Sequence, residues 1–425
     1  MKTLFKNCYV LQGHDVKFTN LVVDGDKISY IGDKPMECDS VRNMHGALLM
    51  PGLVNAHAHG PMTLLRGVGS GLKLQDWLNN AIFPLEAKMT PEDIIAGENW
   101  AIIEMLAAGM TTVAEMYDFP WDIGEALKKS GMKANICRVG LSFSDQEEIP
   151  PNRFAECLDI VKNFKDPSGK VVADFCLHSE YLTNETIVQK IADANKECKV
   201  SVHVHVSETQ AETEECKLRH NGLSPIQYFN KVGLLDNNTY AAHCVWVDDA
   251  DLAIMKEKGV SIVHNPTSNM KLGSGFAPIR KALANGVNVA LGTDGVASNN
   301  SLNLFKEMSM AAIIHNGHRL DPQSILPSQV VDMATINGAK ALGRYDTGVL
   351  EVGKKADIIA VSLDGPHMYP VIDMLALLCY SVQSSDIKMT MVDGKILYDN
   401  GEYTTMDYDK AKFELGKRVK GLFDE

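Results

Sequence analysis

Residues 47–60 read Ala47-Leu48-Leu49-Met50-Pro51-Gly52-Leu53-Val54-Asn55-Ala56-His57-Ala58-His59-Gly60, an apolar run that ends in two histidines one residue apart. Successive side chains of a strand point to opposite faces, so His57 and His59 project to the same side and can hold one metal ion. Such a pair is also compatible with two polar residues at a strand end. The metal interpretation therefore depends on partners elsewhere in the chain.

Partners of this kind follow three later apolar runs, which end in His203-Val204-His205-Val206-Ser207-Glu208, in His243 and in Gly292-Thr293-Asp294-Gly295. Three histidines and one aspartate suit a borderline divalent ion such as zinc and leave a position for water. Iron and other first-row ions accept the same donors. We expect one divalent ion per chain, with the ligands His57, His59, His205 and Asp294.

An acid or base beside the ligands indicates catalysis, because a structural metal needs neither. Glu208 lies three residues after His205, and His243 ends the next run. A bound ion would make hydroxide available from water near neutral pH. Glu208 would carry a proton from that water to the substrate, and His243 would stabilise the hydroxide or the tetrahedral centre. The carbon attacked would belong to a purine or pyrimidine amidine, a cyclic amide or a halogenated triazine.

Eight short runs rich in strand-forming residues alternate with stretches of helical periodicity. Such alternation predicts an α/β fold, and eight repeats favour a closed (β/α)8 TIM barrel over an open sheet. Thr90-Pro91-Glu92-Asp93 predicts one helix start, and a second helix is expected over residues 184–198. The predicted strands are 47–59, 110–115, 133–140, 171–180, 200–208, 239–246, 260–265 and 287–294.

The candidate residues all lie at the carboxyl ends of predicted strands. In a TIM barrel these ends and the loops that follow them form the active site. Unrelated surface residues would not be expected to coincide there. The residues at the first, fourth, fifth, sixth and eighth ends are His57, His59, His178, His205, Glu208, His243 and Asp294.

The sequences on either side of the predicted barrel show a different pattern, which is typical of short strands separated by turns. Each flank is too small for a core of its own, so we expect the two to form one small β-sandwich beside the barrel. The predicted domains are a composite sandwich of residues 1–50 and 350–425 and a catalytic barrel of residues 51–349.

Composition limits the partners of the chain. A net charge of −13 over 425 residues disfavours nucleic acid and anionic membrane surfaces. The nine cysteines are scattered, with no Cys-x-x-Cys pair, which favours reduced thiols. Without a secretory signal or an apolar run long enough to span a membrane, a cytoplasmic location is expected. We expect a small-molecule substrate and a homo-oligomer.

Other polar residues are interpreted as structural. His203 lies one layer deeper than His205 and is expected in the barrel interior, and His264 is expected to support a loop. The acidic group Glu212, Glu214 and Glu215 is expected on a solvated helix face. The remaining histidines have no constellation of site residues around them and are expected to be solvated or structural. They are His14, His45, His220, His315, His318 and His367.

Together these motifs resemble the amidohydrolase superfamily in its mononuclear deaminase branch, over nearly the whole chain. Binuclear members of that superfamily use a modified lysine near the fourth strand, and Cys176-Leu177-His178-Ser179-Glu180 has none. Within the branch the chain is similar to the 5-methylthioadenosine/S-adenosylhomocysteine deaminase family. The segments that carry this similarity are Phe83-Pro84-Leu85-Glu86-Ala87-Lys88, 203–209, 264–272 and 293–300.

The resemblance implies roles for three residues that spacing does not single out. It implies that Glu86 binds the ribose hydroxyls, that His178 binds the nucleoside and that Arg153, expected in a loop, binds a homocysteine carboxylate. Without the resemblance, Glu86 and Arg153 would be interpreted as surface residues. The chain departs from the family at Leu177-His178-Ser179-Glu180-Tyr181, where His-Ala-Pro-Tyr is expected, so the preferred nucleoside is left open.

The expected activity is metal-dependent hydrolytic deamination at C6 of 5'-substituted adenosines, giving the inosine derivative and ammonia. The candidate substrates are 5'-methylthioadenosine, S-adenosylhomocysteine and adenosine. The alternative is another mononuclear amidohydrolase, such as a guanine, pterin or chlorotriazine hydrolase, and Glu86 separates the two because a free base has no ribose. A non-catalytic metal-binding protein is a third possibility, which Glu208 and His243 disfavour. Cytidine-deaminase-type enzymes need a Pro-Cys-x-x-Cys pair, which the chain lacks.

Overall fold

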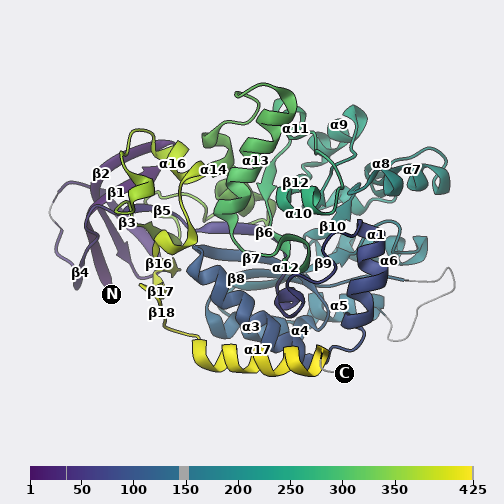
Figure 1. The fold of residues 1–425 in the computed structure, drawn as a ribbon, viewed down its shortest axis with the longest axis horizontal. Coiled ribbons are helices and arrows are strands. Elements are labelled where there is room, and N and C mark those ends of the chain that lie inside the picture. The colour runs from purple at the N-terminus through teal and green to yellow at the C-terminus, as the bar shows by residue number, and fades with distance from the viewer. Residues whose placement is uncertain (35, 143–152, 424–425) are drawn as a thin grey trace.

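A computed structural model describes residues 1–34, 36–142 and 153–423 of the chain. Its strands form two sheets of nine strands each. One sheet is the barrel and the other joins the two ends of the chain. In Figure 1 the sheet of the chain ends lies at the left, and the barrel with its helices fills the centre and right.

The barrel sheet is parallel throughout and closes on itself. Its order is β13-β12-β11-β10-β9-β8-β7-β6-β14. The eighth predicted run is split into β13, which pairs with β12, and β14, which pairs with β6 through Asp294 and Ala58. The predicted TIM barrel is thereby confirmed. Its strands are β6 (Leu53–His59), β7 (Met110–Tyr117), β8 (Lys133–Arg138), β9 (Val171–Leu177), β10 (Val202–Val206), β11 (Thr239–His243), β12 (Ser261–His264), β13 (Val289–Leu291) and β14 (Asp294–Gly295).

The prediction of one strand over residues 47–59 is wrong. Residues Leu48–Pro51 form β5 in the sheet of the chain ends, and the barrel strand β6 begins at Leu53. Gly52 lies between them, where a Cβ atom would come within 2.3 Å of the Thr111 hydroxyl oxygen. Only glycine lets the backbone pass from one sheet to the other this close to β7.

The second sheet joins both ends of the chain, as predicted. The N-terminal strand β5 pairs antiparallel with the C-terminal strand β15. Phe5, Val10 and Leu21 share one buried cluster with Ile358 and Met389. The other strands are β1 (Lys2–Gln12), β2 (Asp15–Asp24), β3 (Lys27–Gly32), β4 (Ser40–Asn43), β15 (Ile358–Val361), β16 (Ile387–Val392), β17 (Lys395–Asp399) and β18 (Glu402–Tyr403). The domain limits 1–50, 51–349 and 350–425 stay a prediction.

Local sequence signals place several helix starts. Thr90 and Asp93 form a reciprocal capping box at the start of α3, with Pro91 as its first residue, as predicted. The expected helix over 184–198 is α6, capped by Asn184. The α-helices are α1 (Leu74–Trp77), α2 (Phe83–Glu86), α3 (Pro91–Ala107), α4 (Pro120–Ser130), α5 (Arg153–Asn163), α6 (Glu185–Cys198), α7 (Gln210–Arg219), α8 (Pro225–Lys231), α9 (Asp249–Lys258), α10 (Pro266–Lys271), α11 (Ile279–Ala284), α12 (Val296–Asn299), α13 (Leu304–Arg319), α14 (Pro327–Ala334), α15 (Ile336–Ala341), α16 (Met374–Tyr380) and α17 (Tyr408–Phe423).

Short helical turns complete the chain. They are η1 (Gly60–Leu65), the π-helical turn η2 (Leu78–Ile82), η3 (Leu234–Asp236), η4 (Pro366–Met368) and η5 (Ser384–Asp386). The C-terminal helix α17, yellow in Figure 1, runs along the lower edge of the molecule against α3.

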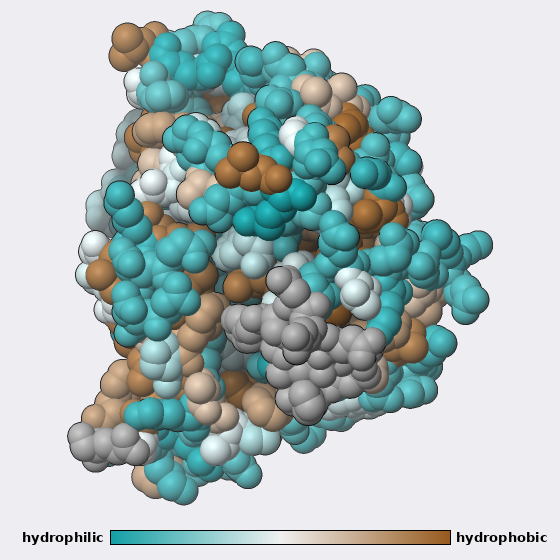
Figure 2. Space-filling model, turned by 90° about the vertical axis from the view of Figure 1, so that its right-hand side faces the viewer, coloured by the Kyte–Doolittle hydropathy of each residue, from teal (hydrophilic) through white to brown (hydrophobic). Residues whose placement is uncertain are grey.

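The last features of the fold concern its surface, its cysteines and the character of its helices. The face seen in Figure 2 is mostly hydrophilic, with smaller apolar areas scattered between the hydrophilic ones. All nine cysteines are free. Within the described ranges, no helix combines the length and the apolar character needed to cross a membrane.

Candidate active site

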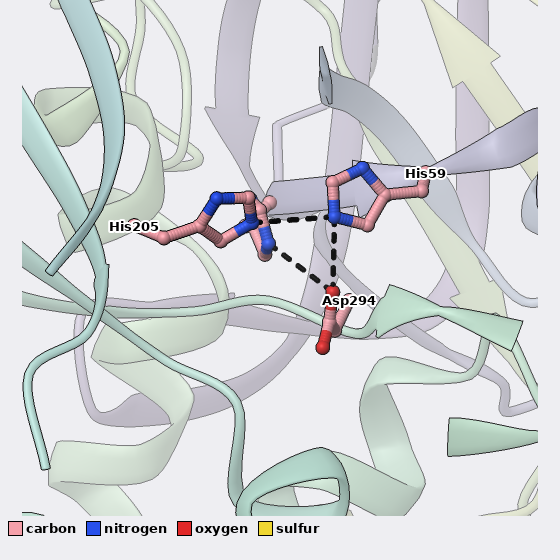
Figure 3. A group of neighbouring side chains, drawn as sticks. His59, His205 and Asp294 are labelled. Atoms are coloured by element: carbon pink, nitrogen blue, oxygen red, sulfur yellow. Dashed lines mark hydrogen bonds and ion pairs between the residues drawn. The ribbon is translucent and has the colours of Figure 1, made fainter. Parts of the chain in front are cut away.

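The four expected metal ligands meet at the carboxyl ends of the barrel strands. His57 and His59 come from β6, His205 from β10 and Asp294 from β14, and one donor atom of each lies within 4.8 Å of the others. Asp294 Oδ1 is 3.2 Å from His57 Nε2 and 3.1 Å from His59 Nε2. Figure 3 shows His59, His205 and Asp294 turned toward one another. The group has the compact geometry that a single ion requires.

The Nδ1 atom of each of the three imidazoles forms a hydrogen bond with a neighbouring residue. His59 Nδ1 donates to the carbonyl of Met116 at 2.5 Å, and His205 Nδ1 donates to the carbonyl of His178 at 2.7 Å. A carbonyl oxygen only accepts, so Nε2 of both neutral rings keeps its lone pair for the centre of the group. His57 Nδ1 lies 2.8 Å from His203 Nε2. His203 is thus buried in the barrel interior, as expected, and orients a proposed ligand.

One buried atom shows that a cation fits this group. His57 Nε2 has no hydrogen-bond partner among the described residues, although it points toward Asp294. A buried ring nitrogen left in this way costs free energy unless another group binds it. The donor set of three imidazoles and one carboxylate suits a divalent ion.

Burial keeps His57 and His205 neutral, and the neighbouring imidazoles keep Asp294 ionised, which are the forms of these three donors that bind metal. Burial lowers the pKa of His57 to about 4 and the pKa of His205 well below its usual range. Burial opposes ionisation of Asp294, but contacts from His57 and His59 outweigh it and lower the pKa of Asp294 well below its ordinary value. That carboxylate raises the pKa of His59 despite burial. Ser268 Oγ and Ser298 Oγ donate to Asp294 Oδ2 at 2.5 Å and 3.0 Å, which leaves Oδ1 for the centre.

Glu208 and His243 lie beside the group and face each other. Glu208 Oε2 is 3.7 Å from His243 Nε2, and Ser274 Oγ donates to Glu208 Oε1 at 3.2 Å. His243 Nδ1 lies 2.8 Å from the side-chain oxygen of Asn269, to which it donates. Burial raises the pKa of Glu208, although the charge of His243 partly opposes the rise. A carboxyl group with a raised pKa is suited to taking up and releasing a proton near neutral pH.

The backbone that carries Glu208 is held by Glu212. Helix α7 starts just after Glu208, and the Glu212 carboxylate accepts the backbone N–H groups of Ser207 and Glu208, both at 2.7 Å. The prediction that Glu212 lies on a solvated helix face is therefore wrong, since Glu212 is 3% exposed. Its place in the first turn of α7 directs the side chain back to the helix start, where it caps free N–H groups.

A cavity of about 350 Å³ opens over the group and contains the other predicted site residues. Its wall includes His59, His205, Asp294, Glu208 and His243, whereas His57 is fully buried and does not line it. Apolar side chains form much of the remaining wall, including Met62, Trp77, Phe83, Met89 and Leu272. The polar groups that complete it are Glu86, Tyr117, Asp118, Arg153, His178 and Tyr181.

The three residues implied by the resemblance all reach this cavity. Tyr117 donates a hydrogen bond to Glu86 Oε1 at 2.5 Å. His178 directly follows β9. Burial and the neighbouring histidines lower the pKa of His178 to about 3, because both disfavour its charged form. Arg153 is the first residue of α5 rather than a loop residue, and its Nη1 donates to Asp118 Oδ1 at 3.1 Å. Residues 149–152 of the predicted loop lie outside the described residues.

Several supporting residues escaped the sequence analysis. Arg138 ends β8 and binds the same Asp118 carboxylate as Arg153. The position of Arg138 at the end of a barrel strand is the one sequence feature that could have marked it as a site residue. Asn269, Ser268 and Ser274 come from the segment after β12, and their sequence pattern does not mark the side chains that they contact.

A second cluster lies outside the cavity. Glu180 Oε1 accepts a hydrogen bond from His220 Nε2 at 2.7 Å, and Arg219 binds both oxygens of Glu180 at 3.0 Å and 2.5 Å. Cys216 is close enough to form a group of three donors with Glu180 and His220. Because the Arg219 guanidinium already occupies the carboxylate, the cluster fits an ion-pair clamp rather than a metal site.

Four of the remaining histidines have side-chain hydrogen-bond partners. His14 Nε2 lies 3.0 Å from Asp332 Oδ1, and His367 Nε2 lies 2.8 Å from Asp386 Oδ2. His220 binds Glu180, and His315 Nε2 lies 3.0 Å from His264 Nε2. His220 and His315 therefore have structural roles, as expected, with partners that lie 40 and 51 residues away in sequence.

The chain is similar to known deaminases along nearly its whole length. Residues 48–397 match the model of the amidohydrolase family. A 5-methylthioadenosine/S-adenosylhomocysteine deaminase of Acetivibrio thermocellus is 43% identical over 91% of this chain and 90% of its own length. A 5'-deoxyadenosine deaminase of Methanosarcina mazei is 39% identical over 99% of this chain and 98% of its own length. The crystal structure of an adenosine deaminase from Xanthomonas campestris with bound zinc has a TM-score of 0.93 at 30% identity, and the match covers 100% of this chain and 99% of that one.

Proposed function

The chain belongs to the amidohydrolase family, and from this premise we propose that it is a hydrolytic deaminase of 5'-substituted adenosines. The substrates are 5'-methylthioadenosine, S-adenosylhomocysteine, 5'-deoxyadenosine and adenosine, and the products are the inosine derivative and ammonia. The proposal is carried by one observation: the four metal donors, Glu208, His243 and Glu86 line or adjoin a single cavity. The names of the similar deaminases support the same substrate class.

The proposed metal ligands are His57, His59, His205 and Asp294. When bound, a divalent ion there acts as a Lewis acid and lowers the pKa of a water molecule. We propose zinc and one ion per chain, which the zinc of the similar adenosine deaminase structure supports. Fe²⁺ suits the same donors.

The proton steps belong to this chain's own residues. Glu208 takes a proton from the attacking water and delivers it to N1 of the purine, which makes C6 more electrophilic. His243 Nδ1 donates to Asn269, so its Nε2 is the atom that accepts a hydrogen bond from that water and orients it toward C6. Glu208 then transfers the second proton from the oxygen newly bonded to C6 to the amino group. The C6–N bond breaks, ammonia leaves and the C6 carbonyl of the inosine derivative remains.

Substrate binding divides the cavity between apolar and polar groups. Trp77, Phe83 and Leu272 offer apolar surface to the purine and to a 5'-thioether. The Glu86 carboxylate accepts hydrogen bonds from the ribose diol, and His178 contacts the nucleoside. Arg153 pairs with the carboxylate of S-adenosylhomocysteine.

An ultraviolet screen of the purified protein tests the proposal. The panel contains adenosine, 5'-methylthioadenosine, S-adenosylhomocysteine, guanine, cytosine and a chlorotriazine. We expect turnover of the 5'-substituted adenosines. Activity confined to the free bases or the triazine would overturn the nucleoside assignment and identify the chain as one of the other mononuclear amidohydrolases.

The proposal also covers the location, the oligomeric state and the partners of the enzyme. We propose that it acts in the cytoplasm as a homo-oligomer, without nucleic acid or membrane partners. The nine free cysteines support a reducing compartment. Light scattering after size-exclusion chromatography measures the oligomeric state.

A further inference from the structure

We propose that Tyr117 is a specificity-determining positioning residue, whose hydroxyl orients the Glu86 carboxylate toward the ribose diol. The inference rests on the proposed function, because it assigns a role to a neighbour of the proposed ribose-binding group. Neither the spacing of the motifs nor the implied site residues point to Tyr117.

The geometry brings the two residues together from different parts of the fold. Glu86 is the last residue of α2, and Tyr117 is the last residue of the barrel strand β7. The Tyr117 hydroxyl lies 2.5 Å from Glu86 Oε1 and 3.9 Å from Met89 Sδ. Both residues line the cavity that holds the metal donors. The hydroxyl thus reaches Glu86 from the barrel side of the substrate space.

Strand β7 makes Tyr117 a rigid support. The preceding residue, Met116, accepts the hydrogen bond of His59 through its carbonyl. Tyr117 is 6% exposed, so its ring has little room to change rotamer. The same strand end therefore orients a proposed metal ligand and the group proposed to bind ribose, which fixes the distance between these two parts of the site.

The chemistry of Glu86 explains why a donor is needed. Burial raises the pKa of the Glu86 carboxyl group, and the hydrogen bond from Tyr117 opposes that rise. A neutral carboxyl group presents one O–H donor and a weaker acceptor, whereas a carboxylate accepts both hydroxyls of a diol. Tyr117 engages one oxygen with a short, charge-assisted hydrogen bond and limits rotation of the carboxylate.

The test is the preference of Tyr117→Phe for a ribose over a 2'-deoxyribose. We would measure kcat and KM for 5'-methylthioadenosine and for its 2'-deoxy analogue. Wild-type enzyme should prefer the ribose form, and Tyr117→Phe should reduce the ratio of the two kcat/KM values about tenfold, since hydrogen bonds to charged groups are of this strength. The change should appear mainly in KM of the ribose substrate. Partial unfolding lowers both rates equally and leaves the ratio unchanged.

A double-mutant cycle with Glu86→Ala shows whether Tyr117 acts through Glu86. If it does, the ratio for the double variant equals that for Glu86→Ala alone. Tyr228→Phe is the matched control, because the Tyr228 ring stacks on His220 outside the cavity. That control should keep the wild-type ratio.

The possible outcomes separate the inference from the proposed function. A wild-type ratio in Tyr117→Phe, or fully additive effects in the cycle, would overturn the role of Tyr117 while nucleoside deamination stands. A wild-type enzyme that deaminates no nucleoside would overturn the proposed function, and the inference with it.

Discussion

Glu208 and His243 touch the proposed water and substrate positions without belonging to the group of four metal donors. Glu208 has the raised pKa of a buried carboxyl group and a partner in Ser274, so its proton can move while its position is held. Its role therefore differs from that of a ligand, and the difference can be measured by comparing metal content with turnover.

We expect Glu208→Gln to keep its metal and lose most of its activity. The amide has nearly the same shape but cannot carry the proton, and such groups contribute about 10²- to 10⁴-fold. The measurement combines kcat with elemental analysis. Glu215→Gln, on the exposed side of the adjoining helix α7, is the matched control and should keep wild-type kcat. A near wild-type rate in Glu208→Gln would assign the proton transfer to another group.

Arg153 offers a second test at a single side chain. Arg153→Ala should lower kcat/KM for S-adenosylhomocysteine about tenfold or more, because a charge-assisted pair with the substrate carboxylate is lost. It should affect 5'-methylthioadenosine much less, since that substrate has no carboxylate. Equal losses on both substrates would leave Arg153 as a structural partner of Asp118.

Helix α7 connects two parts of the site. Glu208 immediately precedes the cap of α7, and Arg219 and His220 at its other end bind Glu180. Glu180 in turn belongs to the segment after β9 that brings His178 and Tyr181 to the cavity. This element therefore ties the proposed proton carrier to the wall that is proposed to contact the nucleoside.

The clamp at the end of α7 should stabilise the fold. Glu180→Ala removes a carboxylate that is 4% exposed and leaves Arg219 and His220 without their acceptor. We expect the free energy of unfolding in urea to fall by about 2 kcal/mol. Glu185→Ala is the control, because its side chain is 77% exposed and lies 3.4 Å from the same His220. That control should change stability by less than about 0.5 kcal/mol, and an equal loss in both variants would contradict the clamp.

Metal binding should couple to the stability of the complete barrel. The proposed ligands come from β6, β10 and β14, so one ion links the neighbouring strands β6 and β14 to the more distant strand β10. A ligand that binds only the native state raises its stability. We expect elemental analysis to find close to one metal per chain, and chelation followed by dialysis to lower Tm reversibly. Two tightly bound ions in the active site would contradict the single-ion proposal.

A buried acid on α3 should make stability depend on pH. Glu98 is fully buried, its oxygens have no hydrogen-bond partner among the described residues, and burial raises its pKa to about 8. Because the unfolded value is about 4.3, the native state binds more protons between these values, and its stability falls as pH rises through that window. Glu98→Gln should reduce the fall in Tm between pH 5 and 8, and the exposed Glu92→Gln on the same helix should not. An unchanged pH dependence in Glu98→Gln would assign it to other groups.

The strand-end histidines and acids were predictable because they follow local rules. His57 and His59 share a face through the two-residue period of a strand, and His205 and Asp294 end apolar runs of their own. A parallel barrel gathers all such ends on one side whatever the details of packing. The barrel, the joined chain ends and the proximity of the proposed ligands therefore followed from periodicity and topology.

Contacts between residues far apart in the chain could not be predicted in this way. Tyr117 meets Glu86, His203 meets His57 and Arg219 meets Glu180 only after helices and strands have packed, and none of these pairs has a recognisable spacing. The passage from β5 to β6 at Gly52 likewise depends on how closely Thr111 approaches. Periodicity sets the direction of each side chain, whereas the partner that it finds depends on the positions of all neighbouring elements.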